Sequence, residues 1–203
     1  MDDAQRAERE LAQIAPALDE YLAQVAGPLL VAEAKLLYLV ATEVRQGAIV
    51  AAGSTGARPA VALGRGSVDG HGVDVFVVGG APAADDGDQA RVNLTRALVV
   101  CGLEPTVRLI ELDAEAVAGG WSRPIAALWL GSSPLSGDSI REFERWAKHL
   151  TQDAFVLVEH RGDSGPKEWV ETLAEAGQLD HVETVGRVSL YQVNEGADLC
   201  ATA

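Results

Sequence analysis

The sequence predicts an α/β fold, a doubly wound, mostly parallel sheet of seven strands with an antiparallel C-terminal hairpin. Short continuous apolar runs alternate with amphipathic runs, which is typical of buried parallel strands alternating with covering helices. The first apolar run leads into a glycine-bearing loop at 53–59 and then directly into a helix. The last two apolar runs, 181–185 and 187–193, are separated only by Gly186, which indicates a tight antiparallel hairpin.

The N-terminal segment 1–28 is predicted to be a helical extension. Its apolar residues keep the 3,4 spacing of one helical face, and Pro16 interrupts that spacing. We therefore expect two short helices, with Pro16 near the start of the second and a break at Gly27-Pro28. The apolar face either covers the chain's own core or forms the seam of a homodimer. The residues of this face are Ala4, Ala7, Leu11, Ile14, Leu18, Tyr21 and Val25.

The main domain is expected to span residues 29–194, followed by a mobile tail at 195–203. It begins with a mostly buried helix over 31–47, which Gly47 is expected to close. Further strands are expected at 49–52, 73–80, 106–112, 125–130 and 154–159. Further helices are expected at 84–102, closed by Gly102, and at 114–120. Another is expected after a cap at Ser136 or Asp138, and a last one at 165–177.

Charge and composition exclude several classes of partner. The chain has 30 Asp and Glu against 16 Lys and Arg, a net charge of -14, so it would repel a nucleic-acid backbone. Cys101 and Cys200 are far apart and lack the spacing of a metal site, which favours a reducing compartment. No apolar run reaches the roughly 18 residues of a membrane span. We expect a cytoplasmic protein that binds neither nucleic acid nor membrane.

The loop after the first strand has the features of a cofactor cradle. Gly53 and Gly56 allow the backbone to approach a ligand closely, and Pro59 suits the first turn of a helix whose free N–H groups face the loop. No Asp or Glu lies between Gly47 and Gly66, although such loops commonly use a carboxylate to hold a ribose or an ammonium group.

These features occur in an order that resembles a known family. LLYLV in a helix, the glycine loop, RVNLTRALVVCGL, and a strand ending before SGDSIREFERWAKHL follow one another between about Val25 and Val193. This order resembles class I S-adenosylmethionine-dependent methyltransferases, in the branch of small-molecule O-methyltransferases and cephalosporin-hydroxylase-like proteins. The resemblance implies a Rossmann-like methyltransferase fold, the cofactor S-adenosylmethionine and a small-molecule substrate. It places Gly53, Ser54, Gly56 and Arg58 at the cofactor.

Several positions depart from the family pattern. Ala51 stands where relatives end the first strand with Glu, and Gly79 stands where a carboxylate usually binds the cofactor ribose. Asp85 or Asp86 could reach back to replace that carboxylate, or could simply cap the next helix. We therefore expect S-adenosylmethionine binding at Gly79 and the glycine loop to be weak or lost.

The family's metal site is also altered. Relatives often place Asp at the end of the fourth strand and His slightly beyond, whereas this chain has Gly131 and Pro134 there. Neither residue offers a side-chain oxygen to a hard cation. We therefore expect no catalytic metal.

Two further residues are candidate site residues. Relatives commonly end the fifth strand with His-Asp, and Glu159 and His160 stand at the matching positions in this chain. His160 is the candidate catalytic base, or else a loop residue paired with Glu159 or Asp163. Asp113 follows the third strand, where relatives place a polar residue beside the adenine, and it could equally cap the following helix.

Three functions fit these patterns. The first is metal-independent methyl transfer from S-adenosylmethionine to an oxygen or nitrogen of a small molecule. The second is a methyltransferase fold that has lost methyl transfer and catalyses a cyclisation, isomerisation or elimination. The third is a noncatalytic binding partner. Cofactor binding separates the first from the third, and turnover with an unchanged cofactor would indicate the second.

Overall fold

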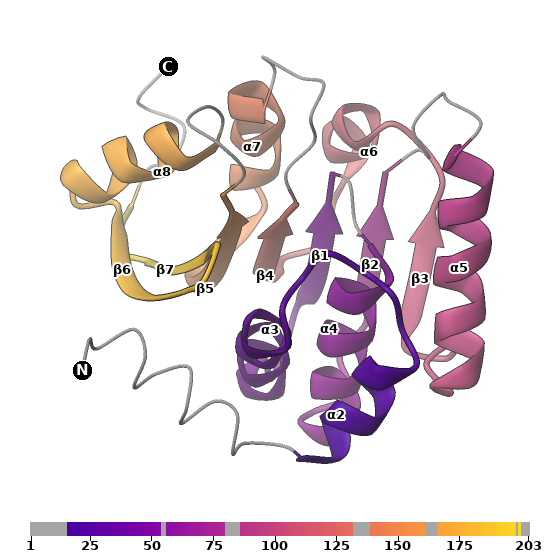
Figure 1. Cartoon of the computed structure of the whole chain (residues 1–203). Helices are drawn as coiled ribbons and strands as arrows, with labels where there is room; N and C mark the ends of the chain where they lie inside the picture. The colour runs from indigo at the N-terminus through magenta and orange to yellow at the C-terminus, as the bar shows by residue number, and fades with distance from the viewer. Residues whose placement is uncertain are drawn as a thin grey trace.

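The computed structural model describes residues 16–53, 56–79, 86–131, 139–160, 166–197 and Leu199. They form a seven-stranded sheet in the order β3-β2-β1-β4-β5-β7-β6 (Figure 1). β7 runs antiparallel to the other six strands, which all run in one direction, so the predicted fold is confirmed. The strands are β1 Ala48–Ala52, β2 Val75–Val78, β3 Val107–Ile110, β4 Ile125–Leu130, β5 Leu150–Glu159, β6 Leu179–Val185 and β7 Val188–Val193.

Helices cover both faces of the sheet. In Figure 1, α3 and α4 lie in front of the strands and α5 lies beside β3. One face packs against α2 Pro16–Ala23, α3 Val31–Glu43, α4 Ala57–Asp69 and α5 Asp86–Val100. The other packs against α6 Ala114–Gly120, α7 Ser139–Ala147 and α8 Pro166–Glu175.

The central strand β1 is buried along its whole length because both faces are covered. Ile49 and Ala51 belong to the core beneath α3 and α4, whereas Val50 and Ala52 belong to the core beneath α6 and α7. This alternation places every side chain of β1 in one of the two cores. Any ligand can therefore reach β1 only at its end.

The glycines expected to close helices have different roles in the structure. Gly102 adopts φ +65° just after α5, and Leu103 donates its N–H to the carbonyl of Leu98, so this predicted helix end is confirmed. Gly47 does not close the preceding helix. The helix ends at Glu43, and Gly47, at φ +86°, forms the turn into β1.

The second helix of the predicted extension begins at Pro16, the first residue of α2, as expected. Leu18 and Leu22 are buried in the chain's own core, and the exposed Asp19 pairs with the buried ammonium of Lys35 at 3.0 Å. This part of the apolar face therefore covers the domain itself. The predicted first helix, with Ala4, Ala7, Leu11 and Ile14, lies outside the described residues, as do Ser136 and Asp138.

Candidate functional site

The carboxyl ends of four neighbouring strands, β3, β2, β1 and β4, lie side by side and are joined in pairs by backbone hydrogen bonds. The N–H of Gly131, after β4, donates to the carbonyl of Ala52 at 3.1 Å, and the N–H of Gly79, after β2, donates to the carbonyl of Ile110 at 3.2 Å. Gly53 follows β1 between them. In open α/β sheets, this edge, where the strand order reverses, is where ligands bind.

Two of these positions cannot accept a side chain without rearrangement. Gly53 has φ +85°, and a Cβ there would lie 2.8 Å from the carbonyl oxygen of Gly131. Gly79 has φ +155°, and a Cβ there would lie 2.6 Å from the carbonyl oxygen of Gly53. Only glycine leaves this backbone arrangement unstrained. We call Gly53, Gly79 and Gly131 the glycine cradle.

Gly56 differs from the cradle glycines. It is the N-cap of α4 with φ -71° and ψ 169°, a conformation open to any residue, and the nearest atoms to a Cβ there would be 3.9 Å away. Close approach is therefore required at Gly53 and Gly79 but not at Gly56. The start of α4 still presents free N–H groups at this edge. Ser54 lies outside the described residues.

Arg58 holds the segment that precedes α3. Its Nε donates to the carbonyl of Val25 at 2.9 Å, and its Nη1 donates to the carbonyl of Leu29 at 2.6 Å. We call residues 25–30 the strap. A Cβ at Gly56 would contact Pro28, so the strap borders the start of α4. The hydrogen bonds of Arg58, a residue predicted at the cofactor, thus fix the strap beside the loop.

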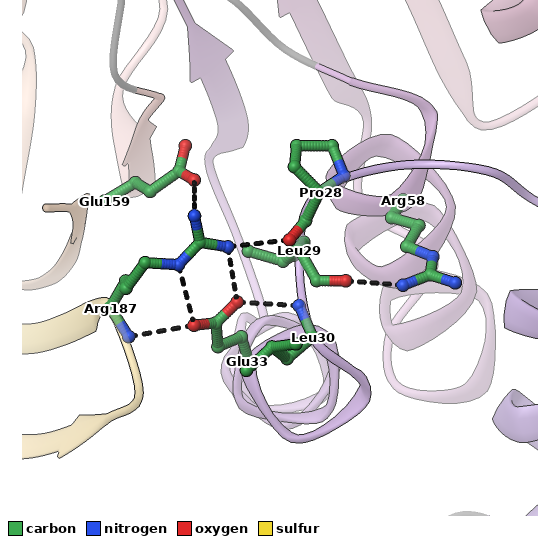
Figure 2. Close-up of polar contacts among 7 residues, drawn as sticks. All are labelled: Pro28, Leu29, Leu30, Glu33, Arg58, Glu159 and Arg187. Carbon is green, nitrogen blue, oxygen red and sulfur yellow. Dashed lines mark hydrogen bonds and ion pairs between the residues drawn. The ribbon is translucent and has the colours of Figure 1, made fainter. Parts of the chain in front are cut away.

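A second arginine holds the strap from the other side, from the C-terminal hairpin. Arg187 lies in the turn between β6 and β7, and its Nη2 donates to the carbonyl of Pro28 at 2.6 Å. Figure 2 shows the two guanidinium groups approaching the strap from different elements. The strap is therefore tied to α4 and to the hairpin at once.

Glu33 in the first turn of α3 completes this network. Its side chain is fully buried, and it accepts the N–H of Leu30 at 2.7 Å and the N–H of Arg187 at 2.8 Å. The guanidinium of Arg187 also lies 3.4 Å from Glu33 and 3.9 Å from Glu159, at the end of β5 (Figure 2). One cation thus faces two buried carboxylates.

Sequence reasoning missed Glu33 and Arg187. Their positions are 154 residues apart, so no local pattern connects them. The available signal was an acidic residue in the mostly apolar run VAEAKLLYLV. A charged side chain on a buried helix needs a partner from elsewhere in the fold.

His160 lies half-buried directly after β5, as predicted, at the same edge of the sheet as the cradle. Its N–H donates to the carbonyl of Arg187 at 2.7 Å, and its Nε2 lies 2.7 Å from Oγ of Ser189 on β7. Backbone and ring are therefore both fixed by the hairpin. Asp113 is the N-cap of α6 and accepts the N–H of Ala116 at 2.9 Å, the capping role weighed above.

The positions that lack the family carboxylates are closely packed. Ala51 is fully buried between Val77 of β2 and Trp129 of β4. The indole N–H of Trp129 is also buried and has no hydrogen-bond acceptor among the described residues. Asp85 and Pro134 lie outside the described residues, and so does the side chain of Asp86.

The described part of the chain lacks two kinds of feature. No group of three or more His, Cys, Asp or Glu side chains is arranged to hold a metal ion there. No helix in that part is both long and apolar enough to cross a bilayer.

Comparison with known proteins gives matches in structure but not in sequence. No protein-family model and no curated protein matches the chain. The structure is similar to cofactor-bound Rv0187 from MTB, with a TM-score of 0.65 and 16% identity over 97% of this chain and 92% of that one.

Two O-methyltransferases are similar to this structure with slightly lower TM-scores. TomG from Streptomyces achromogenes, involved in tomaymycin synthesis and solved in complex with SAM, has a TM-score of 0.63 and 19% identity over 93% of this chain and 89% of that one. The enzyme from Bacillus cereus in complex with SAH has a TM-score of 0.61 and 14% identity over 94% and 91%. The chain therefore has the Rossmann-like fold of S-adenosylmethionine-dependent O-methyltransferases.

Proposed function

We propose that the protein is a metal-independent S-adenosylmethionine-dependent methyltransferase that acts on an oxygen or nitrogen of a small molecule. The glycine cradle beside the start of α4 is the observation that carries this proposal. Backbone groups approach one another there so closely that Gly53 and Gly79 tolerate no side chain. The structural neighbours solved with SAM and SAH support the same cofactor.

The described residues fit the backbone requirements of this cofactor better than its charge requirements. Gly53, Gly56 and Gly79 would bind it through main-chain contacts, with Ser54 in the same loop and Asp113 beside the adenine. Ala51 and Gly79 offer no carboxylate for the ammonium group or the ribose. Each lost charge-assisted hydrogen bond weakens binding by about 1.5–3 kcal/mol. We therefore expect an affinity below that of relatives with both carboxylates.

S-adenosylmethionine, when bound, supplies an electrophilic methyl group. The chain's own contribution is to position the acceptor, and the strap held by Arg58 and Arg187 supports one wall of the region where this takes place. His160 lies at the end of β5, and its ring is fixed by Ser189 of β7. It takes up the proton that the acceptor releases.

Other features of the proposal come from the sequence. Gly131 has no side-chain oxygen for a divalent ion, so methyl transfer is expected to continue in EDTA. A cytoplasmic location and a homodimer through the N-terminal helices remain predictions. The division into an extension at 1–28, a domain at 29–194 and a tail at 195–203 also remains one.

The test is a methyl-transfer assay with labelled S-adenosylmethionine and a panel of small phenols, alcohols and amines, with EDTA present. We expect a methylated product, and a loss of about a hundredfold in rate for His160→Gln. His71→Gln, a change at an exposed turn, is the matched control and should keep the rate.

The other outcomes separate the alternatives. Cofactor binding with turnover but no methyl transfer would indicate that the fold catalyses a different reaction. An absence of any cofactor binding would contradict the enzyme proposal and favour a noncatalytic partner.

A further inference from the structure

The side chain of His160 begins a continuous row of hydrogen bonds across the hairpin. Its Nε2 lies 2.7 Å from Oγ of Ser189, which lies 2.8 Å from Oγ1 of Thr184. Oγ1 of Thr184 lies 2.9 Å from Nε2 of His181. Two imidazole rings are thus connected through two hydroxyl groups.

An irregularity in β6 makes this row possible. Thr184 pairs with Ser189, and His181 pairs with Tyr191, so both pairs belong to one face of the hairpin. Residues three apart on a regular strand point to opposite faces. A register shift between His181 and Glu183 brings His181 and Thr184 onto the same face. Bulges of this kind re-aim side chains near active sites.

The row leads from the interior to the surface. His160 is half-buried, Ser189 is buried, and Thr184 and His181 are exposed. A hydroxyl group can accept one proton while donating another, so each member can pass a proton onward. We propose that Ser189, Thr184 and His181 form a relay that carries the proton taken up by His160 to solvent. This inference rests on the proposed function, in which His160 is the base.

The relay balances without any further reactant. The ring of His160 gains the proton of the acceptor group, and the proton on its Nε2 moves to Oγ of Ser189. The proton of Ser189 moves to Oγ1 of Thr184, whose own proton moves to Nε2 of His181. His181 then releases the proton of its other ring nitrogen to water. Each hydrogen bond exchanges one proton, and no electron is gained or lost.

Other titratable and charged groups border the row. Tyr191 lies near Ser189, and burial raises the pKa of the Tyr191 hydroxyl, so this group keeps its proton near neutral pH. Glu159 precedes His160 in the chain, and Arg187 lies across the hairpin, where its carbonyl accepts the N–H of His160. The negative charge of Glu171 on α8 also raises the pKa of Tyr191. Tyr191 is buried, so a proton passed toward it would not reach solvent.

A matched pair of variants at Thr184 tests the relay without requiring turnover. Thr184→Val removes the hydroxyl and keeps the branched shape of the side chain, whereas Thr184→Ser keeps the hydroxyl. Exchange of the His160 ring proton with water can be measured by NMR on protein with ¹⁵N-labelled histidine rings. We expect about tenfold slower exchange in Thr184→Val and unchanged exchange in Thr184→Ser. Equal exchange in both variants would overturn the relay.

A further variant, His181→Gln, tests the last member of the relay. It keeps a hydrogen-bonding group near Thr184 but cannot carry the proton. Ring exchange at His160 should slow as in Thr184→Val, and added imidazole should restore the methyl-transfer rate. Unchanged exchange in this variant would also overturn the relay. If ring exchange behaves as expected but no methyl transfer is found in the wild type, the proposed function fails and the relay stands.

Discussion

The carboxylate of Glu33 accepts the backbone N–H of Arg187 at 2.8 Å, across 154 residues of sequence. This contact joins the first turn of α3 to the turn of the C-terminal hairpin, and the guanidinium of Arg187 continues to the carbonyl of Pro28 in the strap. The two residues thus connect the N-terminal and C-terminal parts of the domain at the edge where the glycine cradle lies.

Arg187→Met is expected to destabilise the fold by about 2 kcal/mol, because the buried carboxylate of Glu33 loses its counter-charge but keeps two backbone N–H donors. Urea denaturation of the wild type and the variant measures this difference. Arg187→Lys keeps the charge without the fork of donors and should recover only part of the loss.

A double-mutant cycle with Glu33→Gln tests whether the two residues act together. The double variant should be more stable than the sum of the single losses predicts, because neither charge is left unpaired. Additive losses would show that the two side chains stabilise the fold independently, contrary to the network in Figure 2.

Gly53→Ala and Gly56→Ala should behave differently although both change the same loop. At Gly53, the positive φ and the carbonyl of Gly131 oppose a side chain, so a loss of about 1–3 kcal/mol in stability and a fall in cofactor affinity are expected. At Gly56, the space is open and the backbone is ordinary, so stability should not fall. Thermal melting and calorimetric titration of the two proteins measure both effects. Equal losses would show that the cradle geometry is wrong.

Restoring a carboxylate at Gly79 should weaken cofactor binding rather than strengthen it. The Cβ of Gly79→Asp would lie 2.6 Å from the carbonyl oxygen of Gly53, and the backbone at φ +155° disfavours any side chain. The position therefore offers neither a carboxylate nor the space for one. Tighter binding of S-adenosylhomocysteine by Gly79→Asp would refute this explanation of the family difference.

Stability at alkaline pH should depend on Tyr191. Desolvation, the largest cause, raises its pKa in the folded protein, so the neutral hydroxyl is favoured by folding. This contribution is present below the unfolded pKa of about 10 and is lost as the pH rises through the higher folded value. Denaturation curves between pH 9 and about 11 should show a decline that is smaller in Tyr191→Phe.

The fold could be predicted because its signals are local. Buried strands such as 125–130 are continuous apolar runs, and a tight turn at Gly186 permits little except a hairpin. The glycine at 102 was correctly expected to end a helix for the same reason. Gly47 was assigned to the wrong structural role, since a glycine with positive φ closes a helix or begins a strand with equal ease.

The site could be predicted only in part, because its polar contacts join distant segments. The glycines of the cradle and the position of His160 follow from strand ends, which the sequence marks well. The contacts of Arg58 with Val25 and Leu29 depend on where the strap passes, and no local spacing encodes that path. The relay depends likewise on a single register shift in β6.

The glycine cradle is proposed to bind S-adenosylmethionine without the carboxylates that usually hold this cofactor. Calorimetric titration of the purified protein with S-adenosylhomocysteine in EDTA tests it most directly. We predict saturable binding with a Kd between about 1 µM and 1 mM, lost in folded Gly53→Ala and retained in Gly56→Ala. Absence of binding at millimolar ligand would contradict the claim, and a submicromolar Kd would show that other residues replace the missing carboxylates.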